Sequence, residues 1–191
     1  MKTSRRKFIA TAAAIPALPL PARSVWQRSS RASSKGPKLG TVTYNIAKSW
    51  DIETLIKNLT EVGMEGVELR TTHAHGVEIS LTPEQRAQVR KRFEDSPIRI
   101  GGLGTTCEYH SADPAVLRRN IEETKEWVKL AKDLGSPSVK VRPNGLRKDA
   151  PEEKSLEQIG KALKECGVFA LDHGIKIQLE VHGRDTARLP R

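Results

Sequence analysis

The stretch LTEVGMEGVELR (59–70) contains a complete junction between a helix and a strand. Its first half continues an apolar helical spacing, Gly63 suits the left-handed position that ends a helix, and GVELR alternates as a strand does. The same order returns twice later in the chain: Gly135 before SVKVR (138–142) and Gly174 before IKIQLEV (175–181). Strands that alternate with helices are typical of parallel sheets with right-handed crossovers. The sequence therefore predicts an α/β fold.

Working outward from this junction, five β-rich runs are separated by four helical patterns. The predicted strands are 39–46, 66–70, 98–104, 138–142 and 175–181. Residues suited to capping begin the helices between them: Asp51, Thr82 with Gln85, Asp113, and Ser155 with Gln158. Two architectures fit, an open doubly wound sheet and part of a (β/α)8 barrel. No GxGxxG follows the first strand, and ionisable residues gather just after the strands, as they do at the mouth of a barrel.

Four motifs together carry a resemblance to a known family: EGVELRTTHAHGVE (65–78), CEYHSADP (107–114), VKVRPNGL (139–146) and LEVHGRDTARLP (179–190). They resemble the sugar phosphate isomerase/epimerase proteins with a xylose-isomerase-like TIM barrel, and in particular exported members with twin-arginine leaders. The resemblance runs from about Lys38 to the last residue. It implies that residues 39–191 form a partial (β/α)8 TIM barrel of about five parallel strands with outer helices, an N-terminal fragment of the family fold.

The resemblance also implies a divalent metal at the barrel mouth, namely Mn, Mg, Co or Zn. In the family one Glu ends strand five, and an Asp, a His and a second Glu come from strands six to eight. Glu180 in LEVHG matches the first position, which implies that it is both a metal ligand and a catalytic carboxylate. Four further residues are expected to line the mouth and bind a small sugar-like substrate: His182, His110, Arg142 and Glu68.

The implied function is isomerase or epimerase chemistry, in which a metal-dependent proton transfer takes place next to a carbonyl. The 191-residue chain by itself is expected to be inactive and poorly soluble, because three strands of the barrel and their ligands are missing. Four apolar side chains are expected on its open inner side: Val42, Val67, Val139 and Leu179. The alternatives are a non-catalytic sugar-binding or remnant protein and an endonuclease-IV-like phosphoesterase.

Two side-chain assignments stay open from the residues alone. Glu180 near the end of an apolar strand either binds metal or pairs with Arg142 or Arg184, since a charge in that position needs a partner. His73 and His75 form an HxH, which either binds a metal or lies solvated on a loop.

The N-terminus contains an export signal. In SRRKFIA (4–10), Arg5 and Arg6 precede an apolar run, the pattern that the Tat translocon reads. The sequence predicts a signal peptide over 1–22, a flexible linker over 23–38 and export to the periplasm. The apolar run contains two prolines and is shorter than the roughly 20 residues of a transmembrane helix, so no stable membrane span is expected.

The basic charge of the chain belongs mainly to this leader. Nine of the 33 Lys and Arg residues lie in 1–38 with no acid, which leaves 24 bases against 23 acids in the rest. Nucleic-acid binding depends on a basic surface, so a nucleic-acid partner is not expected.

Overall fold

The computed structural model describes residues 37–143 and 145–180. These residues contain five strands and four helices: β1 (Gly40–Val42), α1 (Ile52–Glu61), β2 (Gly66–Arg70), α2 (Pro83–Glu94), β3 (Arg99–Gly104), α3 (Pro114–Leu134), β4 (Ser138–Val141), α4 (Glu152–Asp172) and β5 (Lys176–Leu179). Among these helices none is long and apolar enough to cross a membrane. The predicted signal, most of the predicted linker, and the residues Arg5, Arg6 and His182 lie outside the described part of the chain.

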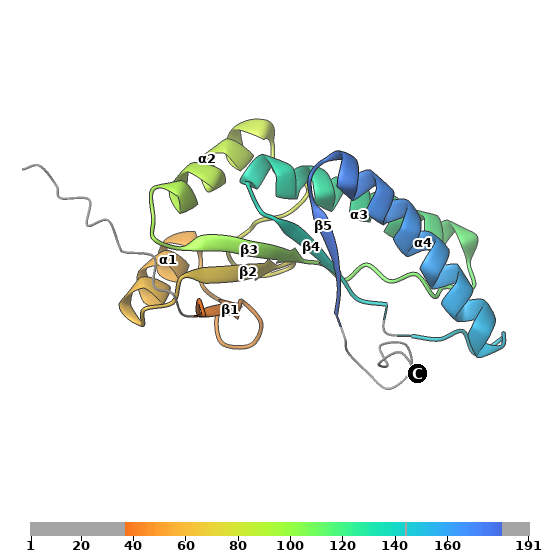
Figure 1. The fold of residues 1–191 in the computed structure, drawn as a ribbon. Coiled ribbons are helices and arrows are strands. Elements are labelled where there is room, and N and C mark those ends of the chain that lie inside the picture. The colour runs from red at the N-terminus through yellow and green to blue at the C-terminus, as the bar shows by residue number, and fades with distance from the viewer. Residues whose placement is uncertain (1–36, 144, 181–191) are drawn as a thin grey trace, which may run out of the picture. The chain divides into compact units, whose positions relative to one another are not determined.

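The five strands form one parallel sheet in the order β1-β2-β3-β4-β5, which confirms the predicted partial barrel wall. Figure 1 shows α2, α3 and α4 together on one side of this sheet. Between the partners of Val67 and Glu68, strand β3 inserts Gly101 as an extra residue. This bulge keeps Gly102 and Gly104 in register with Glu68 and Arg70, so these four positions lie on the same face of the sheet.

The apolar side chains of β2 to β5 point toward the helices. Val67, Leu69, Leu103, Val139 and Val141 are at most 1% exposed. They form one core with apolar residues of the helices, among them Leu55, Leu59, Val128, Ala131, Ile159 and Ala162. Burying side chains of this size contributes about 1.5–3 kcal/mol each, so this interface is what holds the helices on the sheet.

The expectation of an apolar inner side is therefore wrong for three of the four residues. Val67 and Val139 lie under the helices, whereas Val42 is in register with Glu68 and lies half-buried on the opposite face, as expected. Leu179 is 45% exposed, but it is in register with Val141 and so belongs to the helix side of the sheet. The physical reason is the two-residue alternation of a strand, which sends these three residues outward and their polar neighbours inward.

Most helix boundaries follow the predicted capping residues. The Asp51 carboxylate accepts a hydrogen bond from the Thr54 N–H at 2.8 Å, and Thr82 with Gln85 forms both hydrogen bonds of a capping box. Asp113 caps α3 in the same way, through the Ala115 N–H. The predicted helix-end glycines all have positive φ: Gly63 at 74°, Gly135 at 72° and Gly174 at 72°.

The predicted cap at Ser155 is wrong. Helix α4 begins earlier, at Glu152, and Ser155 is buried with its Oγ accepting from the Arg147 N–H at 3.1 Å. Gln158 donates to the carbonyl of Tyr109 at 2.8 Å instead of closing a capping box. Both side chains tie α4 to neighbouring loops, because contacts distant in sequence compete with the local cap.

The first strand is shorter than predicted. Only Gly40–Val42 pairs with β2, and the chain then turns at Asn45, which has φ 47°. The Ile46 N–H donates to the Tyr44 carbonyl at 2.5 Å within this turn. The turn leaves Tyr44 half-exposed at the carboxyl end of the sheet.

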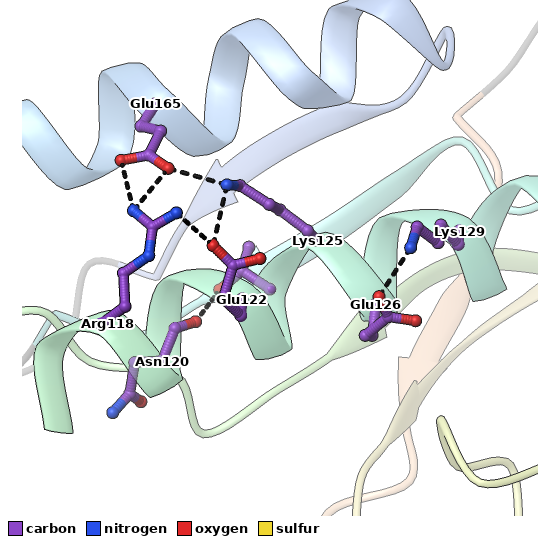
Figure 2. A network of polar contacts seen from close by, with 8 residues as sticks. Arg118, Asn120, Glu122, Lys125, Glu126, Lys129 and Glu165 are labelled. Atoms are coloured by element: carbon purple, nitrogen blue, oxygen red, sulfur yellow. Dashed lines mark hydrogen bonds and ion pairs between the residues drawn. The ribbon is translucent and has the colours of Figure 1, made fainter. Parts of the chain in front are cut away.

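A charged network joins α3 to α4 on the outside of the fold (Figure 2). Glu165 of α4 accepts from Arg118 at 2.9 Å and from Lys125 at 2.7 Å. Glu122 also pairs with both of these cations. Single exposed ion pairs contribute little, but a network of shared charges fixes the relative position of the two helices that flank β4.

Candidate functional site

The face of the sheet opposite α2–α4, called here the open face, carries mainly charged and polar side chains, together with glycines and the apolar Val42. The residues that the alternation of the strands assigns to it include Val42, Glu68, Arg70, Gly102, Gly104, Ser138, Lys140, Arg142, Lys176, Gln178 and Glu180. Arg142 and Glu180 come directly after β4 and β5, at the carboxyl end where barrel active sites form.

Lys140 lies between two carboxylates on the open face. Its Nζ is 2.6 Å from Glu68 Oε1 and 3.5 Å from Glu180 Oε2. The side chains of Glu68, Lys140 and Glu180 are 21%, 19% and 29% exposed, so solvent screens these charges only in part. Glu68 Oε1 is buried, and its short contact with Lys140 is an ion pair without hydrogen-bond alignment.

Gly104 makes this row of charges possible. Glu68 of β2 reaches Lys140 of β4 by crossing over β3, and a Cβ at Gly104 would lie 2.9 Å from Glu68 Oε1. A side chain at that position would push the carboxylate away from the ammonium. The glycines that end β3 therefore open the space into which Glu68 extends.

A second group of charges follows β3 and β4. Arg142 Nη2 lies 3.4 Å from Glu108 Oε1, and the other oxygen of Glu108 lies 3.6 Å from His110 Nδ1. That His110 nitrogen is buried and has no hydrogen-bond partner within 37–143 and 145–180. The ring packs against Gly145, where an added Cβ would lie 2.5 Å from His110 Nε2. The backbone N–H of Glu108 donates to Asn120 of α3, which anchors the loop.

A small pocket connects the open face to the loops at its carboxyl end. Its volume is about 140 Å³, and its lining residues are Val42, Tyr44, Arg70, Lys140, Arg142 and Glu180. A larger groove of about 460 Å³ lies toward the amino ends of β1 and β2, where barrels of this kind do not place their chemistry. The small pocket is therefore the candidate site.

The structure brings most of the predicted site residues to the same end of the sheet. Glu180 and Arg142 line the pocket, Glu68 joins Glu180 through Lys140, and His110 joins Arg142 through Glu108. His182 lies outside the described residues. Whether any of these residues binds a substrate stays a prediction.

Sequence reasoning named neither Lys140 nor Arg70 as a site residue. The cation found 3.5 Å from Glu180 is Lys140, and Arg184 lies outside the described residues. The signal was available in SVKVR, because Lys140 and Arg142 occupy the polar positions of an alternating strand. Arg70 ends β2 in the same way, but nothing in the sequence shows that it lies beside Lys140.

The HxH segment is built into the loop. His75 Nε2 lies 2.9 Å from the Arg70 carbonyl, and its Nδ1 accepts from the Val77 N–H at 3.0 Å. Burial lowers the pKa of His75 to about 4, so the ring is neutral at pH 7 and donates from Nε2. Both nitrogens are occupied by backbone, which removes His75 as a metal ligand. His73, whose pKa is also lowered by burial, contacts Thr43 Oγ1 at 2.9 Å.

The described residues do not assemble a metal site by themselves. Within 37–143 and 145–180 no three His, Cys, Asp or Glu side chains are grouped as metal ligands. The nearest arrangement is Glu68 with Glu180, and the ammonium of Lys140 already lies between them. A divalent cation generally needs more protein ligands than this pair supplies.

Comparison with solved structures shows a common fold. The IOLI protein with a binding zinc atom has a TM-score of 0.65 and 18% identity, and the match covers 75% of this chain and 51% of that one. D-psicose 3-epimerase in the presence of D-fructose has a TM-score of 0.60 and 17% identity, with 74% of this chain and 51% of that one covered. The 3-keto-D-glucoside 4-epimerase YcjR from E. coli has a TM-score of 0.61 and 10% identity, with 75% of this chain and 56% of that one covered. The chain spans about half the length of these proteins, 51% to 56%. Identities this low show the fold alone.

Sequence comparison places the chain in a family. None of the curated protein sequences matches it. The family model of the xylose isomerase-like TIM barrel matches residues 56–189, well over half of the chain. The match extends from the middle of α1 to beyond β5 and includes the Glu68, Lys140, Arg142 and Glu180 positions on the open face. The chain therefore belongs to the xylose isomerase-like TIM barrel family.

Proposed function

We propose that this protein is a sugar isomerase or epimerase that moves a proton on the carbon next to a carbonyl. The observation that carries the proposal is the open face, where two carboxylates and an ammonium form a continuous row beside a small pocket. The family assignment supports it, as do the sugar epimerases among the structural neighbours. A substrate rich in hydroxyl groups suits a face of hydrogen-bonding side chains.

In this proposal Glu180 is the carboxylate that takes or returns the proton. A hydrogen on a carbon next to a carbonyl is very weakly acidic, so the developing negative charge on oxygen needs a cation nearby. Lys140 lies 3.5 Å from Glu180 and Arg142 lines the same pocket, which gives the charge two candidate partners. Glu68, His110 and His182 bind substrate hydroxyls around this centre.

Divalent-metal dependence remains a prediction from the family resemblance. Glu180 is the expected ligand for Mn, Mg, Co or Zn, and such a cation would stabilise the negative charge that develops on the carbonyl oxygen; the described residues alone do not complete a site. Metal analysis of the purified protein decides the matter, with Glu180→Gln compared against wild type. An unchanged metal content in Glu180→Gln would remove Glu180 from the ligand set.

Solvent deuterium exchange tests the function directly. The protein is incubated with D-fructose in deuterated water, and incorporation next to the carbonyl is followed by NMR. We expect Glu180→Gln to lose at least about 100-fold in exchange rate, as removal of a general base does. Glu61→Gln, an exposed carboxylate at the end of α1, is the matched control. Sugar binding without any exchange would overturn the proposal and favour the non-catalytic alternative, whereas exchange by the wild type would contradict the expectation that the 191-residue chain is inactive.

The twin-arginine pair supports a second proposal, export by the Tat translocon to the periplasm. Replacing Arg5 and Arg6 together with Lys keeps the charge and removes the recognised pair. We expect the double variant to stay in the cytoplasm while the wild type is recovered from the periplasm. Equal periplasmic amounts of the two would contradict the assignment.

A further inference from the structure

Among the three cations that line the pocket, Arg70 is the one without an ion pair to any residue that the structure describes. Lys140 is paired with Glu68 and Glu180, and Arg142 with Glu108. Among the described residues no carboxylate lies within ion-pair distance of the Arg70 guanidinium. The guanidinium nevertheless lines the pocket, next to Lys140 and Arg142.

The planar head of Arg70 is held by an aromatic ring. Its Cζ lies 4.5 Å from the centre of the Tyr44 ring. Stacking of this kind is favourable and leaves the N–H donors at the edge of the guanidinium free to bind an acceptor. Tyr44 is itself 50% exposed, so its ring contributes little to the core and instead orients the Arg70 guanidinium at the mouth of the pocket.

Buried polar groups fix the backbone of Arg70. Its N–H donates to the Oγ1 of Thr43 at 3.0 Å, and its carbonyl accepts from His75 Nε2 at 2.9 Å. Thr43 is 0% exposed and His75 is 6% exposed. Burying such groups is favourable only when they are hydrogen-bonded, and here their hydrogen bonds hold the backbone of Arg70, the last residue of β2, in place.

The two loops that carry this pair also contain the strained backbone positions of the described residues. Asn45 follows Tyr44 with φ 47°, and Thr72 lies two residues after Arg70 with φ 66°. A positive φ is costly for a β-branched residue. The Thr72 N–H is held by the Glu78 carboxylate at 2.6 Å, which stabilises the turn. Strain retained beside a binding pocket is typical of pre-organised sites.

We propose that Arg70, oriented by Tyr44, binds an acidic group of the substrate, a phosphate or a carboxylate. The inference rests on the proposed function, because it names the class of sugar that the same pocket takes. A guanidinium binds either group through two parallel hydrogen bonds, and the single uncompensated positive charge is neutralised by the ligand. His73 and His75 are then supports of a binding arginine, which accounts for the HxH motif without a metal.

Binding of three matched sugars tests this inference. Titration calorimetry is carried out with D-fructose, D-fructose 6-phosphate and D-fructuronate, so that a phosphate and a carboxylate are compared with the same neutral ketose. We expect one or both acidic sugars to bind at least about tenfold more tightly than D-fructose, which corresponds to about 1.4 kcal/mol. Whichever of the two acidic sugars binds more tightly identifies the acidic group as a phosphate or a carboxylate.

The Arg70→Met variant keeps the aliphatic stem over Tyr44 and removes the charge. It is expected to bind the acidic sugars about 10- to 100-fold more weakly, with D-fructose unchanged. Arg70→Lys, which retains the charge but not the planar fork, should recover part of the loss. Arg99→Met removes an exposed arginine at the opposite end of β3 and should change nothing. Circular dichroism confirms that each variant is folded.

The inference and the proposed function fail in different ways. Equal wild-type affinity for the three sugars, or an acidic preference that survives Arg70→Met, overturns the role of Arg70. Deuterium exchange on D-fructose that is unaffected by Arg70→Met would then leave the proposed function standing. Conversely, an Arg70-dependent acidic preference without any exchange supports the subsite and counts against the proposed chemistry.

Discussion

The two faces of the same sheet differ in composition: one is apolar and buried under helices, and the other is mainly charged or polar. On the helix side, Val67, Leu103 and Val139 are buried and joined to one apolar core. On the open face, the neighbouring positions in the same strands carry Glu68, Gly104 and Lys140. Strand alternation makes both faces from one short segment, so stability and chemistry are encoded in adjacent residues. Substitutions one residue apart should therefore have effects of different kind.

The largest expected effect is on the helix side. Leu103→Ala removes a side chain that is 0% exposed, and it should lower the free energy of unfolding by about 2–5 kcal/mol. Leu179→Ala, at a position 45% exposed, should cost less than about 1 kcal/mol. Urea titration of the two variants measures the difference. Both residues lie on the helix side, so similar losses at the two positions would mean that the degree of burial on that side does not decide the stability.

The loop after β2 should make stability depend on pH. Burial lowers the pKa of His75 from 6.5 to about 4, so the unfolded chain takes up the proton first as the pH falls. The stability contributed by neutral His75 is complete above about pH 6.5 and is lost as the pH falls toward 4. The loss approaches roughly 3 kcal/mol at about 1.4 kcal/mol per pKa unit.

The His75→Gln variant isolates this contribution. It should be less stable than wild type at pH 7 because its hydrogen bonds are imperfect, and it should lose less stability on acidification. Urea titrations of both proteins at neutral and acid pH give the comparison. Parallel losses in wild type and variant would show that His75 does not carry the pH dependence.

A smaller effect is expected within the row of charges. Lys140→Met leaves the partly buried Glu68 carboxylate without its cation, at a cost of about 1–3 kcal/mol in unfolding free energy. The double variant Glu68→Gln with Lys140→Met should recover much of that loss, and the coupling is read from a double-mutant cycle. Lys129→Met, which breaks an exposed pair with Glu126, should cost under about 0.5 kcal/mol. Additive single losses would contradict the coupling.

The smallest effect on stability is expected at Gly104. A Cβ there would lie 2.9 Å from Glu68 Oε1, and the flexible Glu side chain can move away at a cost below about 1 kcal/mol. The consequence should instead be local, because Glu68 is displaced from Lys140. A crystal structure of Gly104→Ala would show a longer Glu68–Lys140 separation. An unchanged 2.6 Å contact would disprove the spacer role of the glycine.

The elements that sequence reasoning predicted well are those specified by local chemistry. The caps at Asp51, Thr82 and Asp113 depend on side chains two or three residues from the N–H groups that they accept from. The prediction failed at Ser155, where Arg147 competes for the hydroxyl, and at residues 43–46, where the chain turns at Asn45. Those outcomes depend on neighbours that the periodicity of a segment does not contain.

In the candidate site, too, some features could be predicted from the sequence and others depend on contacts between distant segments. The sequence indicated which residues end strands, and parallel strands bring such ends together, so the position of Arg142 and Glu180 at one edge of the sheet followed from order alone, whereas Glu68 lies in the middle of β2. It did not indicate which charges pair. Lys140 is the cation beside Glu180 because β4 and β5 are neighbours in register, and Glu68 reaches it because β3 has a glycine in between.

By itself, then, the sequence determined the parallel α/β fold, the helix ends and the residues available at the carboxyl edge of the sheet, since periodicity, caps and glycine conformation are local properties. The tertiary structure decided that the open face is charged, that Lys140 lies between two carboxylates, and that Arg70 is stacked on Tyr44 with no ion pair to the described residues. Pairing of charges depends on register and on the space left by glycines in adjacent strands, and both arise only when distant segments pack together.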